Sequence, residues 1–262
     1  MKLSLQEIHE ELLEEMKTFQ GQIAYVISSG DEEIRFNDQD ALSPASTIKV
    51  PIFVEALRHC DQGKLSLDQM VEMKPSDIVG GSGVLQAMNV SSISLRELLT
   101  LMIIVSDNTA TNKVIELVGL EQLNKGFRQL GLSSTVLKRK MMDLEKVQLG
   151  IDNVTTAHDL YICLRVVNDE TVLSENSRMV FYEIMQAQQF QNKLPFYMDK
   201  QKITILNKTG SIAGVENDCG IFQLADRTIY AAVLCNQLRT EHEGIHFIQL
   251  LGKKISRLLE SH

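Results

Sequence analysis

Strand-like segments lie near the two ends of this 262-residue chain, and helical patterns fill most of the stretch between them. From about residue 64 to 185, apolar side chains recur mainly at helical spacing. The β-rich runs cover residues 22–27, 33–36, 202–206, 218–224 and 228–235. One sheet assembled from both ends of the chain accounts for this pattern. The sequence therefore predicts a mixed α/β (α+β) protein, with a sheet unit of residues 1–45 and 190–262 and an inserted all-helical unit of residues 46–189.

A helix is expected at each end of the chain. Ser4 and Glu7 form a capping-box pattern at the start of the first helix. Its apolar face follows at helical spacing and comprises Leu5, Ile8, Leu12, Met16 and Phe19. A final helix is expected over about residues 243–261, again with a continuous apolar face.

The segment 43–53 carries the first candidate for chemistry, a Ser46-x-x-Lys49 pattern at the start of an apolar helical run. One helical turn brings Lys49 onto the same face as Ser46. A neutral amine beside a serine hydroxyl can remove its proton and make it a nucleophile. Pro51 is tolerated only near the start of a helix, which places Ser46 at the N-terminal end. About one such pattern is expected by chance in a chain this long, so this motif alone decides nothing.

Two further motifs follow in the chain. Ser106-Asp107-Asn108 comes after an apolar helical run, and Lys208-Thr209-Gly210-Ser211 comes after the strand-like residues 203–206. Each tripeptide has a chance expectation of roughly one in twenty at this length. Their joint presence, in this order after Ser46-x-x-Lys49, is therefore informative.

Together the three motifs resemble the signature of class A β-lactamases and related penicillin-recognising serine hydrolases. The likeness extends over nearly the whole chain and includes Leu95-Arg96-Glu97-Leu98, Thr155-Thr156 and Asn217-Asp218. It implies a five-stranded antiparallel sheet, flanked by the terminal helices, that packs against an all-helical domain. It also implies a serine hydrolase that opens a β-lactam amide through an acyl-enzyme at Ser46.

The resemblance assigns the catalytic steps to four residues. Ser46 is the nucleophile, and Lys49 takes its proton directly or through water. Ser106 relays a proton to the leaving nitrogen. Asn108 holds Lys49 and the amide of the substrate side chain.

The resemblance also assigns substrate binding to Lys208, Thr209, Gly210 and Ser211. Lys208, Thr209 and Ser211 are expected to bind a substrate carboxylate, which is a use for positive charge in an acidic protein. The backbone N–H groups of Ser46 and Ser211 are expected to form the oxyanion hole.

The predicted long loop of residues 133–153 departs from the family pattern. Relatives that hydrolyse β-lactams rapidly carry a Glu there, within Arg-x-Glu-x-x-Leu-Asn, which activates the water that cleaves the acyl-enzyme. Counting forward from Arg139 reaches Met141, and counting back from Asn153 reaches Lys140. Neither side chain can act as this base.

Asp143 and Glu145 are the remaining candidates for the deacylation base, and the alternative is that both lie on a solvated face of the loop. Without a base, acylation proceeds but deacylation is slow. The chain would then act as a penicillin-binding D,D-peptidase or as an esterase-like hydrolase. A binding module that kept the fold and lost turnover is a third class, which the intact acyl-transfer motifs disfavour.

His242-Glu243-Gly244-Ile245-His246 matches the His-Glu-x-x-His pattern of zinc metallopeptidases. That function needs a helix through the motif, which Gly244 disfavours by about 1 kcal/mol relative to Ala. It also needs a third ligand, and Glu260 is the only acid among the residues that follow. We interpret the motif as a coincidence and expect no metal and no cofactor.

The net charge of −8 disfavours a nucleic-acid or anionic-membrane partner. The expected partner is a small-molecule substrate with a carboxylate, and we expect a monomer. The first residues lack the apolar core of a signal peptide, so the expected location is cytoplasmic if Met1 is the natural start, and secreted or periplasmic if a leader was removed. Four cysteines without metal-ligand spacing, Cys60, Cys163, Cys219 and Cys235, are expected to be buried free thiols.

Overall fold

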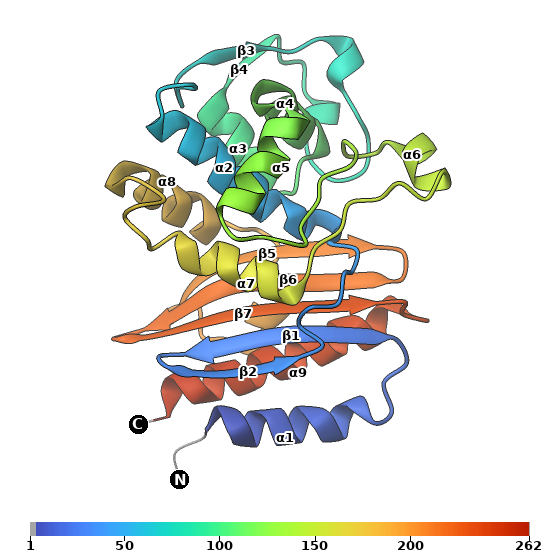
Figure 1. The fold of residues 1–262 in the computed structure, drawn as a ribbon, viewed down its shortest axis with the longest axis vertical. Coiled ribbons are helices and arrows are strands. Elements are labelled where there is room, and N and C mark those ends of the chain that lie inside the picture. Colours follow the sequence, from blue (N-terminus) through green and yellow to red (C-terminus); the bar gives the residue numbers. More distant parts are fainter. Residues whose placement is uncertain (1–3, 262) are drawn as a thin grey trace.

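A computed structural model describes residues 4–261 and contains a five-stranded antiparallel sheet in the order β2-β1-β7-β6-β5 (Figure 1). The strands are β1 (Gln22–Ser29), β2 (Glu32–Phe36), β5 (Thr204–Ile212), β6 (Val215–Leu224) and β7 (Arg227–Asn236). The sheet is thus assembled from both ends of the chain, through the pairing of β1 with β7, and the predicted fold class is confirmed. Residues 1–3, which belong to the expectation about a leader, lie outside the described part of the chain.

The two faces of the sheet support two separate cores. Side chains alternate along a strand, so Ile23, Tyr25 and Ile27 of β1 contact the terminal helices, whereas Ala24 and Val26 face the other way. The terminal helices α1 (Leu5–Met16) and α9 (Glu241–Glu260) cover the lower face in Figure 1. The predicted capping box of Ser4 and Glu7 is present at the start of α1.

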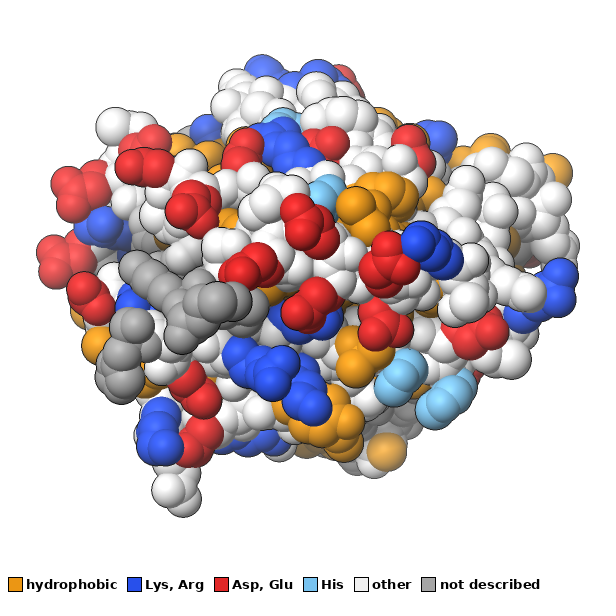
Figure 2. Space-filling view, turned by 90° about the horizontal axis from the view of Figure 1, so that it is seen from below, with side chains coloured by type: hydrophobic (Ala, Val, Ile, Leu, Met, Phe, Trp, Pro, Cys, Tyr) orange, Lys and Arg blue, Asp and Glu red, His pale blue; other side chains and the backbone are white. Residues whose placement is uncertain are grey.

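The outer side of this helical layer mixes acidic and basic side chains, and no broad basic area covers it (Figure 2). Acidic side chains are numerous on this face, in keeping with the net charge of −8.

The helices between the two groups of strands pack over the upper face of the sheet (Figure 1). They are α2 (Lys49–Asp61), α3 (Leu95–Ile104), α4 (Asn108–Val118), α5 (Leu120–Gln129), α6 (Leu144–Gln148), α7 (Ala157–Val166) and α8 (Glu175–Gln186). Helix α2 is buried along most of its length and contacts α3, α4, α5, α7 and α8. The segment that carries Ser46 and Lys49 is therefore fixed at the centre of this layer. We propose that the helical layer and the sheet are the two units expected at residues 46–189 and at 1–45 with 190–262.

Three local features differ from the sequence-based expectation. The middle of the chain is not entirely helical, because β3 (Met70–Glu72) and β4 (Ser92–Ser94) form a short antiparallel pair. The predicted long loop contains the short helix α6. Strand β5 continues to Ile212, so the Lys208-Thr209-Gly210-Ser211 motif lies within the strand and not after it. Hydrophobicity alone predicted the end of this strand too early, since the polar residues of the motif also pair with β6.

All four cysteines are free, and Cys163, Cys219 and Cys235 are buried as expected, whereas Cys60 is partly exposed. Cys219 and Cys235 belong to opposite faces of the sheet, since one is in the core under the helical layer and the other contacts α9. Within residues 4–261, no helix combines the length and the apolar character that a membrane crossing requires.

Helix α9 packs closely against the segment that leads into β5. A Cβ placed on Gly252 would lie 2.0 Å from the carbonyl oxygen of Leu194, in the 3-10 turn η4 (Leu194–Tyr197). Gly244 is similarly close, with a Cβ 2.5 Å from Leu238 Cδ1. Both glycines allow a helix to approach its neighbours more closely than alanine would.

We predict that Gly252→Ala destabilises the protein by about 1–3 kcal/mol, because the added methyl group overpacks against backbone. Helix propensity alone predicts the opposite, a gain of about 1 kcal/mol. Chemical denaturation measures the free energy of unfolding. Lys253→Arg, on the exposed side of the same helix, keeps a positive charge near the ring of Tyr197; it is the control and should change stability by less than about 0.5 kcal/mol. A Gly252→Ala protein that is more stable than the wild type would contradict the packing argument.

Candidate active site

Ser46 lies in a 3-10 turn, η1 (Ala45–Ile48), directly before α2. The preceding residue, Ala45, has a φ of 45°, a conformation that costs a non-glycine residue free energy and is concentrated at functional sites. Lys49 follows Ser46 by one turn, and its Nζ donates a hydrogen bond to Ser46 Oγ at 3.2 Å. The predicted contact between the two side chains is present.

The amine of Lys49 is fully buried and is surrounded by neutral oxygen atoms. Besides Ser46 Oγ, its Nζ contacts Ser106 O at 2.8 Å, Ser106 Oγ at 2.9 Å and Asn108 Oδ1 at 2.9 Å. Burial lowers the pKa of Lys49 well below its usual 10.5, the charge of Lys208 lowers it further, and Asp107 opposes the shift. A neutral amine has a lone pair that can accept the proton of Ser46.

Ser106 and Asn108 are positioned by the loop between α3 and α4. Ser106 has a φ of 55°, which turns the chain sharply so that both its carbonyl and its hydroxyl face Lys49. Asp107 is the N-cap of α4 and accepts hydrogen bonds from the N–H groups of Ala110, Val84 and Leu85 at 2.7–2.9 Å. Asp107 is thus structural. It ties the glycine-rich loop of residues 80–83 to the site.

Strand β5 lies directly against the turn that holds Ser46. A Cβ placed on Gly210 would lie 2.8 Å from Pro44 O, 2.9 Å from Ser46 N and 3.0 Å from Thr47 N. Any side chain here would push the strand away from the nucleophile. Gly210 therefore explains how the Lys208-Thr209-Gly210-Ser211 motif reaches Ser46.

Lys208 is the second fully buried lysine of the site. Within residues 4–261, its Nζ has one hydrogen-bond partner, Thr209 O at 2.7 Å, and no carboxylate within ion-pair distance. Burial lowers the pKa of Lys208 to about 7, and the charge of Lys193 contributes, while Asp218 opposes the shift. An anionic ligand would supply the missing counter-charge.

The Ser211 hydroxyl is already engaged within the protein. It donates to Glu216 Oε2 at 2.8 Å and accepts from Lys193 Nζ at 3.0 Å. Sequence reasoning missed Lys193 and Glu216. Lys193 lies 17 residues before the carbonyl of Gly210 that it also contacts, and no local pattern indicates such a pair.

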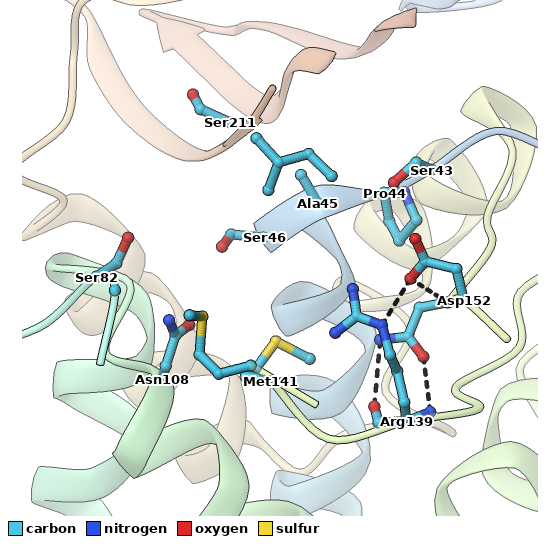
Figure 3. A pocket seen from close by; sticks show the side chains of 14 residues that line it. Ser43, Pro44, Ala45, Ser46, Ser82, Asn108, Arg139, Met141, Asp152 and Ser211 are labelled. Atoms are coloured by element: carbon cyan, nitrogen blue, oxygen red, sulfur yellow. Dashed lines mark hydrogen bonds and ion pairs between the residues drawn. The ribbon is translucent and has the colours of Figure 1, made fainter. Parts of the chain in front are cut away.

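A pocket of about 190 Å³ opens over Ser46. Figure 3 shows Ser46 at its centre, with Ser211 of β5 above it, Met141 below it and Ser82 on the opposite side from Asp152. Of the predicted site residues, the structure brings Ser46, Asn108 and Ser211 to the lining of this pocket. Met142 and Ile212 add apolar walls.

Asp143 and Glu145, the candidate deacylation bases, do not line the pocket. Asp143 instead caps α6 by accepting a hydrogen bond from Lys146 N at 3.2 Å. Glu145 is exposed in the first turn of that helix. The expectation that one of them faces Ser46 is therefore not met, because α6 carries both away from the site.

Met141 is one of the residues that this loop supplies to the pocket wall, and its backbone is fixed by Asn112 through hydrogen bonds at 2.7 and 3.1 Å. The acid in the pocket lining is Asp152, which sequence reasoning did not select. Its Oδ1 accepts from Arg139 Nε at 2.8 Å and from Asn153 N at 2.7 Å (Figure 3). Asp152 thus links Arg139 to the C-terminal end of the loop.

The His-Glu-x-x-His motif lies in the first turns of α9, so a helix does run through it despite Gly244. The rings of His242 and His246 stack with centroids 6.1 Å apart. In the part of the chain that the structure describes, no group of three potential ligands is placed to hold a metal. Gly244 is explained by close packing against Leu238 and Glu216.

Comparison with known proteins agrees with the motifs. A family model described as the beta-lactamase enzyme family matches residues 4–259. Among curated proteins, Beta-lactamase CARB-3 of Pseudomonas aeruginosa is 30% identical over 142 residues, which cover 53% of this chain and 49% of that protein. A beta-lactamase of Rhodobacter capsulatus is 29% identical over 68% of this chain and 61% of its own. The chain spans about half the length of the curated relatives it matches.

Solved structures match over nearly the full length. A beta-lactamase from Sphaerobacter thermophilus is 27% identical, with a TM-score of 0.88 and coverage of 97% of both chains. A point mutant of PBP-A, solved as an acyl-enzyme complex with penicillin G, is 26% identical, with a TM-score of 0.89 and coverage of 99% of this chain and 98% of its own. From the family match, the shared fold and the three motifs around one pocket, we conclude that this chain belongs to the beta-lactamase enzyme family.

Proposed function

We propose that this protein is a serine hydrolase that opens the amide of a β-lactam through an acyl-enzyme at Ser46. The observation that carries the proposal is the buried amine of Lys49, which contacts Ser46 Oγ and has only neutral oxygen partners among the described residues. Its lowered pKa leaves a neutral amine available as a base.

The acylation step follows from these contacts. Lys49 takes the proton of Ser46 as Oγ attacks the lactam carbonyl, and the N–H groups of Ser46 and Ser211 stabilise the oxyanion. As the carbon–nitrogen bond breaks, the proton passes from Lys49 through the hydroxyl of Ser106 to the leaving nitrogen. Contacts of 2.9 Å from Lys49 Nζ to Ser106 Oγ and to Asn108 Oδ1 support this route.

We assign the substrate carboxylate to Lys208 and Thr209. Lys208 is buried and lacks an acidic partner within residues 4–261, so an anion would stabilise its charged form. We also propose that a monomer is the working unit.

The residues that line the pocket support deacylation, the hydrolysis of the acyl-enzyme, less well than they support acylation. Met141 occupies the wall supplied by the loop, and the carboxylate of Asp152 is held by Arg139. This observation favours a second candidate function, a penicillin-binding D,D-peptidase or esterase-like hydrolase whose β-lactam adduct is cleaved slowly. The two candidates share the acylation step and differ only in the lifetime of the adduct.

Incubation with penicillin G should add the mass of the intact drug to the protein, as measured by time-resolved mass spectrometry. Ser46→Ala should remove the adduct completely because it removes the hydroxyl at the centre of the pocket that would attack the lactam carbonyl. Ser28→Ala, which changes a buried serine of β1, is the matched control and should form the adduct as the wild type does. An adduct on Ser46→Ala, or neither an adduct nor loss of the free drug with the wild type, would refute the proposed function.

Met141→Glu should shorten the lifetime of this adduct about tenfold or more, since general bases contribute factors of about 10²–10⁴ when well placed. The measurement is the rate at which the free-enzyme mass returns after excess drug is removed. Met141→Gln has nearly the same shape without the base and should leave the lifetime within about threefold. Equal acceleration by both variants would show that the carboxylate is not responsible.

The second-order rate constant for acylation by a penicillin should rise and then fall with pH. On the acidic side, Lys49 must lose its proton before it can accept that of Ser46. On the alkaline side, Lys208 must keep its proton to attract the carboxylate, so the rate falls as pH rises above about 7. A neutral nitrophenyl ester, measured in parallel, should lack the alkaline decline. A decline of the same size for the ester would contradict the role of Lys208.

A further inference from the structure

A buried ion pair to which the proposed mechanism assigns no role contacts strand β5. Lys193 Nζ and Glu216 Oε2 are 2.6 Å apart, and their side chains are 1% and 3% exposed. Lys193 precedes η4, and Glu216 lies on β6 opposite Ser211 of β5. Burying a charged pair seldom stabilises a fold more than apolar residues of the same size would. Its contacts therefore need another explanation.

The lysine of this pair binds two backbone carbonyls of the sheet. Lys193 Nζ donates to Gly210 O at 2.7 Å and to Asn217 O at 2.9 Å, which lie opposite one another in the β5–β6 ladder. In a planar trans peptide, the carbonyl of Gly210 and the N–H of Ser211 point in opposite directions. By holding this carbonyl, Lys193 therefore directs the N–H of Ser211 away from itself.

The glutamate of the pair, together with Lys193, fixes the Ser211 side chain. Ser211 Oγ donates its only hydrogen to Glu216 Oε2 and accepts a hydrogen bond from Lys193 Nζ. A hydroxyl has one donor, so Ser211 has no hydrogen left for a substrate carboxylate. The side chain acts as a tether that holds the strand to the ion pair.

The orientation of this peptide matters because the strand lies against the nucleophile. Gly210 is so close to Pro44 O and Ser46 N that it leaves no room for a side chain. A small rotation of the 210–211 peptide would therefore change the distance between the two proposed oxyanion donors. The segment that carries Lys193 is itself fixed, since Leu194 N donates to Asp218 Oδ2 at 3.0 Å.

We propose that Lys193 and Glu216 are positioning residues that orient the 210–211 peptide so that the N–H of Ser211 faces the substrate oxyanion, and that the Ser211 hydroxyl is their tether and not a ligand of the substrate. This inference rests on the proposed acyl-transfer function. It differs from the expectation that Ser211, with Lys208 and Thr209, binds the substrate carboxylate.

The test replaces the pair by apolar residues of similar size, in Lys193→Met/Glu216→Leu, and separately removes the tether in Ser211→Ala. Rapid-mixing kinetics then measure the acylation rate constant and the substrate dissociation constant, for a chromogenic cephalosporin that has a carboxylate and for a neutral nitrophenyl ester. Thermal melting checks that each variant is folded. The double variant leaves no unpaired buried charge, so it should fold.

Both variants should lower the acylation rate constant about 10–100-fold for both substrates, because loss or misplacement of an oxyanion donor costs factors of about 10²–10³ at most. The substrate dissociation constants should change by less than about threefold. Combining Ser211→Ala with the paired replacement should add little, because all three side chains act through one peptide. Glu55→Leu/Arg58→Met, which removes a partly buried pair of α2 that does not line the pocket, should leave both rate constants within about twofold.

Other outcomes would overturn the inference. If Ser211→Ala weakens binding of the cephalosporin alone, the hydroxyl is a ligand of the carboxylate. If the paired replacement leaves acylation unchanged in a folded protein, the pair does not position the strand. A wild-type protein that neither substrate acylates would instead refute the proposed function itself, so the two failures are distinguishable.

Discussion

The burial of the Lys49 amine against neutral oxygen atoms is the interaction on which the rest of the site depends. An ammonium group in that position has lost its water and gained no carboxylate, so its charged form is disfavoured. The free-energy cost of burying this amine is offset by packing in the core, since α2 is surrounded by five other helices and its exposed surface is small. The chemistry proposed for Ser46 thus follows from the packing of a helix, and the same packing fixes where the hydroxyl lies.

A second constraint is the close approach of two segments that belong to different layers. The η1 turn precedes a helix of the upper layer, whereas β5 is the edge strand of the sheet. They meet because Gly210 has no side chain, and the strand is held from behind by Lys193 and Glu216. An edge strand has backbone groups that no neighbouring strand satisfies, and here they face the proposed site of reaction.

Three buried lysines gather at this site although the chain as a whole carries a net charge of −8. Lys49, Lys193 and Lys208 are all fully or almost fully buried, and of these three only Lys193 has a carboxylate partner within the described residues. Each charge lowers the pKa of a neighbour, Lys193 that of Lys208 and Lys208 that of Lys49. Pairing Lys193 with Glu216 leaves Lys208 as the unpaired cation for an anionic substrate.

The sequence by itself determined the fold class, the assembly of one sheet from both ends of the chain, and the three motifs, because periodicity and short motifs are local properties. It also identified Met141 as a residue that cannot act as a base. Only the tertiary structure decided that Asp143 and Glu145, at the start of α6, are not among the residues that line the pocket, that β5 extends through Ser211, and that Asp152 lines the site. The sequence also did not reveal the partners of Lys193, since its contacts join segments 17 to 24 residues apart through the pairing of two strands. Contacts of that kind depend on register and packing, which no short stretch of sequence specifies.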